Sequence, residues 1–95
     1  MIQHIVSYKL KDNSKENKQR VVDTMYNGLK DIPQVKSITV RADEFETERS
    51  YDMVLMVTFE SKEDMDIYQV NPEHMKVRAM MKEAREASVS IDFTI

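Results

Sequence analysis

The side chains best suited to acid–base chemistry in this sequence are its two histidines, His4 and His74, because imidazole changes charge near neutral pH. His74 follows Asn71 and Pro72, which are typical of a helix start, and the positive end of the helix dipole disfavours a protonated ring there. A neutral imidazole is what a general base or a polarising hydrogen-bond donor requires. His4 lies in an alternating apolar segment. Each histidine also has a structural interpretation, His4 as a hydrogen-bonded core residue and His74 as a solvated helix-start residue.

Two tyrosines extend this set of candidates. Tyr68 precedes the Asn71-Pro72 pair, and Tyr26 lies in the first expected helix. Each is either a core residue with its hydroxyl at the edge or a side chain that aims its hydroxyl into a cavity between sheet and helices. Two isolated histidines without cysteines or an acidic spacing pattern indicate no metal site.

Composition excludes several classes of protein. The 95 residues are expected to form one domain, residues 1–95, with a net charge of −3 that gives no electrostatic reason to bind nucleic acid. No apolar run approaches the roughly 20 residues of a membrane span, and no secretion signal is recognisable. The absence of cysteine excludes disulfides and thiolate catalysis and fits a cytoplasmic protein. A single glycine excludes glycine-rich phosphate loops, so any pocket is expected to consist of side chains alone and to need no cofactor.

Hydrophobic periodicity predicts the elements that must position these residues. Spacings of two indicate strands and spacings of three and four indicate amphipathic helices. Asn13 or Ser14 is expected to cap the first helix, and Pro33 to end it. The expected elements are strands at 2–10, 35–42, 51–59 and 88–95, a helix from about 14 to 32, a short helix from 61 to 70, and a last helix from Pro72 through Ala87. Their order, β-α-β-β-α-β, predicts an α+β ferredoxin-like protomer, with helices on one face of an antiparallel four-stranded sheet.

Segment 51–59 is apolar on both faces, although the helices cover only one. The second face offers Ile5, Val54 and Met56, and contiguous apolar area of this kind marks an interface. We therefore expect a homodimer through the open sheet face. The alternative is a monomer in which these side chains are scattered among polar ones.

The single glycine, Gly28, falls inside the first helix rather than in a turn. There it costs about 0.5–1 kcal/mol relative to alanine. It indicates either close packing against the sheet, room beside a cavity, or a tolerated substitution.

Taken together, these segments resemble the stress-responsive dimeric α/β-barrel (Dabb) domain family over nearly the whole chain. The similarity rests on the opening Ile2-Gln3-His4-Ile5-Val6, the Ile32-Pro33-Gln34-Val35 helix exit, the segment from Tyr68 through Asn71-Pro72-Glu73-His74, and the closing Ile91-Asp92-Phe93. The family usually has His-Pro-x-His, and here Asn71 takes the first of those positions. The resemblance implies a protomer with a pocket between sheet and helices, and a dimer in which two sheets form a barrel.

The resemblance also implies candidate chemistry. In the polyketide-cyclase (olivetolic acid cyclase-like) branch, a histidine pair and tyrosines perform a cofactor-free aldol-type cyclisation, and the matching residues here are His4, His74, Tyr68 and Tyr26. His74 would then remove a proton α to a carbonyl, and His4 would donate to the developing oxygen anion of a small keto or phenolic compound. The alternatives are a non-catalytic dimer that binds a small apolar ligand or serves stability under stress, and a cofactor-free monooxygenase on the same scaffold.

Overall fold

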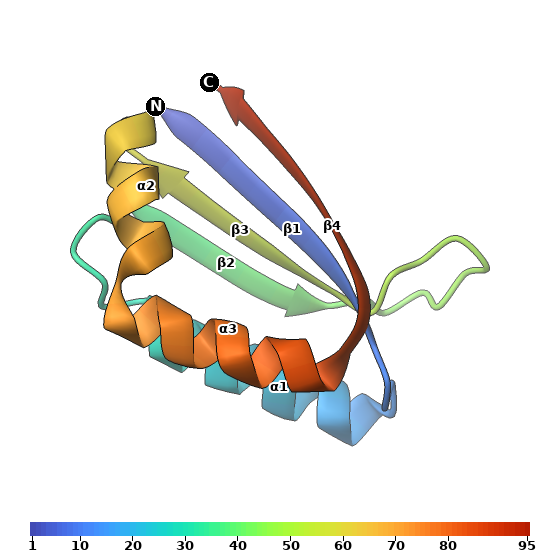
Figure 1. Ribbon diagram of the computed structural model, residues 1–95. Coiled ribbons are helices and arrows are strands. Elements are labelled where there is room, and N and C mark those ends of the chain that lie inside the picture. Colours follow the sequence, from blue (N-terminus) through green and yellow to red (C-terminus); the bar gives the residue numbers. More distant parts are fainter.

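A computed structural model describes residues 1–95 and contains four strands and three helices (Figure 1). The elements are β1 (Ile2–Leu10), α1 (Lys15–Leu29), β2 (Ser37–Ala42), β3 (Met53–Phe59), α2 (Lys62–Val70), α3 (Pro72–Ala84) and β4 (Arg85–Thr94). The expected β-α-β-β-α-β order is confirmed, with the second helical segment divided into α2 and α3.

Short polar side chains start each helix where the sequence predicts. The hydroxyls of Ser14 and Ser61 accept from backbone N–H groups three residues ahead, at 3.3 and 3.2 Å, and begin α1 and α2. Asn71 caps α3 through its side-chain oxygen, with Pro72 in the first turn. These caps satisfy N–H groups that have no partner inside the helix.

The last helix and the last strand differ from the sequence prediction. Residues 85–87 were expected in the helix, but α3 ends at Ala84 and β4 begins at Arg85. Strand pairing explains the difference, because Leu10 pairs with Arg85 and Lys9 with Ala87 across a shift in register. This ladder with β1 outweighs the helical spacing of Ala87. The first helix likewise ends at Leu29 rather than at Ile32.

The sheet has the order β2-β3-β1-β4, with every neighbouring pair antiparallel. All three helices lie on one face (Figure 1). Against them the sheet presents the side chains of His4, Leu10, Leu55 and Val57, each buried, in register with the helix-facing residues of the neighbouring strands. One core therefore lies between the sheet and the helices.

No element covers the other face of the sheet (Figure 1). Ile5 pairs with Met56 on β3 and with Ile91 on β4, so three apolar side chains form a row across the middle of that face. Ile91 is 66% exposed and Phe93, next on the same face, is 45% exposed. The open face, which we define by Ile5, Val54, Met56, Ile91 and Phe93, is therefore apolar as the sequence predicts, and β4 supplies more of it than expected.

Gly28 marks the close approach of α1 to α3, not of α1 to the sheet. A Cβ added there would lie 2.6 Å from Cγ2 of Val77, closer than real Cβ contacts. Val77 is a β-branched residue in a helix, where one χ1 rotamer dominates, so its methyl has little freedom to move away.

We expect Gly28→Ala to lower the free energy of unfolding by about 1 kcal/mol, since overpacking of about 1–3 kcal/mol exceeds a helix-propensity gain of about 1 kcal/mol. Tm should fall by about 4–8 °C. Thermal denaturation of Gly28→Ala, Val77→Ala and the double variant checks this. The two losses of stability should be less than additive, because Val77→Ala removes the clashing methyl. Strict additivity would show that contact with the Val77 methyl does not cause the loss in Gly28→Ala.

Candidate functional site

Strand β4 curves away from α3 (Figure 1), and side chains of both elements line a pocket of about 460 Å³. Its walls come from β1, α3 and β4, and its apolar floor from α1 and β3. The residues that line it are His4, Val6, Tyr8, Met25, Leu29, Leu55, Gln69, His74, Val77, Arg78, Met81, Lys82, Arg85, Ser88, Val89 and Ser90. Both candidate histidines therefore border the same pocket.

His4 is buried and paired with a carboxylate. It lies directly opposite Asp92 in the β1–β4 ladder, and its Nδ1–H donates to Oδ1 of Asp92. The side chain of His4 is 9% exposed and that of Asp92 is 41% exposed, so the pair spans the boundary between core and solvent. Asp92 thereby fixes the ring orientation and leaves Nε2, on the opposite edge of the ring, without a protein partner.

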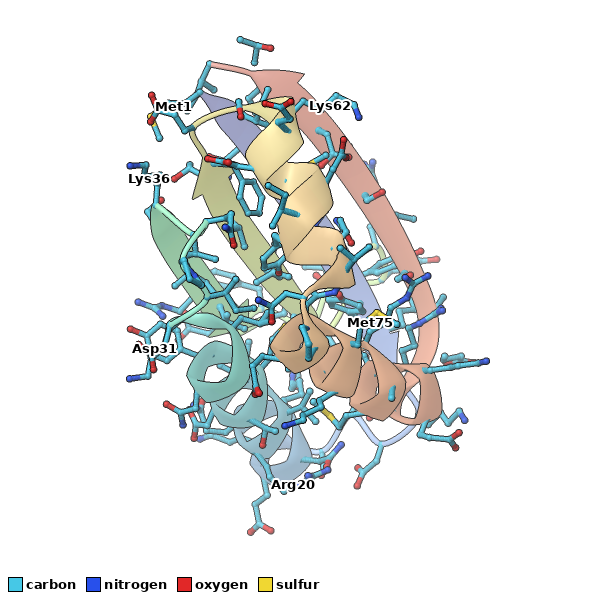
Figure 2. All side chains as sticks on the ribbon, turned by 60° about the vertical axis from the view of Figure 1, so that its left-hand side comes forward. Met1, Arg20, Asp31, Lys36, Lys62 and Met75 are labelled. Carbon is cyan, nitrogen blue, oxygen red and sulfur yellow. The ribbon has the colours of Figure 1, made fainter.

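The break between α2 and α3 holds His74. In a continuous helix the carbonyl of Gln69 would accept from the N–H of Glu73, but that N–H donates to the Asn71 side chain at 2.8 Å. The freed carbonyl accepts instead from Nδ1–H of His74, at 3.1 Å. Because a carbonyl can only accept, this bond places the proton of the neutral ring on Nδ1 and the lone pair on Nε2. Figure 2 shows α2 and α3 in front of the sheet, with Met75 labelled beside this junction.

Burial lowers the pKa of His74, and the positive charge of Arg78 and the neighbouring His4 ring lower it further, against an opposing effect of the hydrogen bond to Gln69. The neutral imidazole therefore predominates at neutral pH. His74 thus offers an unprotonated Nε2, as a general base requires.

Tyr68 lies behind the two histidines rather than on the pocket wall. It is completely buried, and its ring centroid lies 4.5 Å from that of His74 and 6.5 Å from that of His4. Its hydroxyl has no hydrogen-bond partner in the protein. Burial raises the pKa of Tyr68, and Tyr8 contributes to the rise, so the hydroxyl stays protonated.

The structure does not bring Tyr26 to this pocket. Tyr26 is 41% exposed on α1 and borders a shallow surface hollow with Val40 and Arg41, near β2. The helical rotation explains this outcome, because Met25 takes the buried position on α1 and Tyr26 is turned about 100° from it. The tyrosine that does line the pocket is Tyr8.

Sequence reasoning also missed Asp92 as a partner of His4. The strict alternation of residues 88–95 contained the signal, since it places Ser88, Ser90 and Asp92 on one face of β4, and that face is the one toward the helices. No group of three His, Asp or Glu side chains converges in a way that could hold a metal ion. None of the three helices has the length and hydrophobicity needed to cross a membrane.

The lowered pKa of His74 predicts a pH effect on stability. At pH values between the pKa of His74 in the folded protein and its ordinary value of 6.5, the unfolded chain binds more protons than the folded one. The contribution of neutral His74 to the free energy of unfolding is complete above pH 6.5 and is lost as the pH falls through the pKa of His74 in the folded protein. From about pH 7 to pH 5, wild type should therefore lose stability more steeply than His74→Gln. Urea unfolding at several pH values checks this, and parallel curves would contradict it.

These features define the class of protein: a ferredoxin-like α+β chain with a histidine-lined pocket between its sheet and its helices. The family model described as the Stress responsive A/B Barrel Domain (Dabb) matches residues 2–95. The chain belongs to this family.

Similar proteins come from plants and bacteria. The stress-response A/B barrel domain-containing protein DABB1 of Arabidopsis thaliana is 22% identical over 98% of this chain, which spans only 46% of that protein. A dimeric ferredoxin-like protein of unknown function from Thermobifida fusca has a TM-score of 0.86 at 20% identity, over 99% of this chain and 90% of the other. The hydroxynitrile lyase of Passiflora edulis has a TM-score of 0.82 at 18% identity, over 99% and 92%. At these identities the solved structures establish the fold.

Proposed function

We propose that this protein is a homodimer whose pocket binds a small, largely apolar keto or phenolic compound and moves protons on it without a cofactor. One observation carries the proposal: His4 and His74 border one pocket, and each has its Nδ1 held by an acceptor, Asp92 or the carbonyl of Gln69. Both Nε2 atoms are thereby left for a bound molecule. That a protein of the same fold is a hydroxynitrile lyase supports acid–base chemistry on this scaffold.

The proposed reaction assigns one role to each side chain. His74, neutral because its pKa is lowered, takes the proton α to a carbonyl on its Nε2. His4 acts in its protonated form, whose positive charge Asp92 stabilises through Nδ1–H; it donates the Nε2 proton to the developing enolate oxygen and is left as the neutral ring with its proton on Nδ1. Tyr68 packs against the His74 ring and positions it. The apolar floor holds the body of the compound.

Hydrogen–deuterium exchange tests the proposal without knowledge of the natural substrate. Acetophenone in D₂O exchanges its α-protons slowly, and ¹H NMR follows the loss of their signal. We expect wild-type protein to accelerate this exchange and His74→Ala to lose about 10²–10⁴-fold of the acceleration. Met75→Ala, a change at the exposed neighbouring position, is the matched control. If ligand binding shifts the pocket resonances but His74→Ala exchanges as fast as wild type, the pocket binds without catalysis.

The homodimer is proposed to form through the open face. A patch of side chains such as Ile91 and Phe93, exposed on the face of a sheet that no helix covers, is of the kind that protein interfaces bury. The Thermobifida fusca protein of the same fold is described as dimeric, which supports this assembly.

We expect Ile91→Asp to convert a dimer into monomers, because a carboxylate in the centre of the apolar row would be desolvated without a partner. Light scattering after gel filtration should give twice the chain mass of 11.2 kDa for wild type and the single mass for the variant. Val70→Asp, which places the same charge at an exposed valine on α2, should remain dimeric. A monomeric wild type at micromolar concentration would contradict the assembly.

A further inference from the structure

The pocket is lined by positive charge, which the binding of an apolar molecule would not require. Three of its lining residues are cations, Arg78, Lys82 and Arg85, and none of its lining residues is an acid. This is unexpected in a chain with a net charge of −3, whose acidic residues outnumber the basic ones.

The three cations also lack partners in the protein. The ion pairs of the chain bring carboxylates to other cations, for example Glu46 to Lys18, Asp66 to Lys62 and Glu73 to Lys76, and none involves the pocket cations. Like charges near one another repel, and a concave wall with one sign of charge concentrates its field inside the pocket. An anionic group on a ligand would relieve that repulsion.

The cations occupy one end of the pocket. His74, Arg78 and Lys82 follow one another at intervals of four on α3, which places Arg78 about 6 Å and Lys82 about 12 Å along the helix from His74. Across the pocket, Tyr8 lies about 13 Å along β1 from His4. Arg85 pairs with Leu10 in the β1–β4 ladder, two residues beyond Tyr8, which places this cation at the same end; burial raises the pKa of Tyr8, and the charge of Arg85 opposes that rise.

The same end carries neutral hydrogen-bond donors. Ser88 lies opposite Tyr8 in the β1–β4 ladder, and Ser90 lies opposite Val6, two residues nearer to His4 on the same face. Between this cationic end and the histidines, apolar side chains line the pocket: Leu55 of the floor, which lies opposite Val6, with Leu29 of the floor and Met81 of the α3 wall.

We propose that the pocket selects elongated carboxylic acids: the carboxylate binds Arg78, Lys82 and Arg85, the apolar body lies over the floor, and a keto or phenolic group reaches His4 and His74. An arginine guanidinium matches a carboxylate with two parallel hydrogen bonds. This inference rests on the proposed function and adds the charge and the length of the substrate.

A matched pair of ligands tests the inference by isothermal titration calorimetry. The acid is 7-oxo-7-phenylheptanoate, and its neutral counterpart is 7-oxo-7-phenylheptanamide, with the same ketone and the same body. We expect the acid to bind wild type at least tenfold more tightly than the amide at low salt, with a smaller preference in high salt because ions screen the cations.

Substitutions locate the preference. Lys82→Gln should reduce it several-fold, and the triple variant Arg78→Gln/Lys82→Gln/Arg85→Gln should reduce it to within twofold, while affinity for the amide stays and shows that the pocket remains folded. Lys76→Gln removes the same charge from the same helix outside the pocket and should leave the preference intact.

The outcomes separate the two proposals. Equal affinity of wild type for acid and amide would overturn the carboxylate inference and leave the proposed pocket in place. A loss of preference in Lys76→Gln as large as in Lys82→Gln would overturn it too, because net charge and not the pocket would then be the cause. Binding of neither ligand would overturn the proposed function itself.

Discussion

Replacing Tyr68 with phenylalanine is expected to make the protein more stable and less active. The hydroxyl of Tyr68 is buried without a partner, and a buried unsatisfied polar group costs about 1–3 kcal/mol. Its removal should raise the free energy of unfolding by about 1 kcal/mol and Tm by about 4–8 °C. Differential scanning calorimetry measures this gain.

The activity of Tyr68→Phe should change in the opposite direction. The ring lies against His74 and near His4, and the raised pKa of Tyr68 keeps the hydroxyl protonated, so the substitution removes an unpartnered buried donor from the residue that packs behind the two catalytic candidates. A hydroxyl group that lowers the stability of the protein but supports its activity fits the usual trade-off between stability and activity. We expect the α-proton exchange rate to fall about tenfold, with a pH profile displaced from that of wild type because the environment of His74 has changed.

The matched control for this substitution is Tyr26→Phe. Tyr26 is exposed and lies outside the pocket, so the loss of its hydroxyl should leave both Tm and the exchange rate unchanged. A fall in the stability of Tyr68→Phe would show that the hydroxyl has a partner in solution. A gain in stability with unaltered exchange would give Tyr68 a purely structural role.

The local parts of this fold follow from the sequence because their causes are local. Alternation predicts β1 with its observed ends, and the short polar caps Ser14, Ser61 and Asn71 predict where each helix begins. The spacing of Ala87 predicts a helix, but Ala87 lies in β4 because it pairs with Lys9. Lys9 is far away in the sequence, so the local pattern does not reveal this pairing.

The site was predictable in the identity of its histidines and not in their partners. The Nδ1 acceptor of His4 is 88 residues away in the sequence, and only the register of β1 against β4 places it opposite. Lys18 gives a second example: it lies on the buried side of α1 although it is charged, because Glu46 and the carbonyl of Asp43 in the β2–β3 connection accept from its ammonium group. Periodicity predicts which face of an element a residue occupies, but it does not predict which distant group pairs with that residue.

Asp92→Asn should impair catalysis more than any other change outside the two histidines. The asparagine keeps the shape of the side chain, but it removes the negative charge that stabilises a protonated His4 ring. Its amide can also donate to Nδ1, which would move the proton of the neutral ring to Nε2 and reverse the tautomer. We expect α-proton exchange to fall about 10²-fold, within the usual range for general acid–base catalysis.

Two measurements distinguish this positioning role from a general loss of charge. At a pH where the His4 ring is neutral, its ¹⁵N chemical shifts should show the proton on Nδ1 in wild type and a changed tautomer in Asp92→Asn. Glu86→Gln removes the same charge from the same strand without a pocket contact, and its exchange rate should equal that of wild type. Unchanged ¹⁵N shifts in Asp92→Asn would contradict the role of Asp92 in fixing the tautomer.

The double variant Asp92→Asn/Tyr68→Phe shows whether the residues around His4 and His74 act together. The ring of Tyr68 lies behind two histidines whose Nδ1 atoms are fixed from β4 and from the end of α2. If one proton leaves the substrate at His74 while another arrives from His4, a change in the position of either ring disables the same step. The combined loss of rate should then be smaller than the product of the two separate losses. A fully multiplicative loss would mean that Asp92 and Tyr68 serve independent steps.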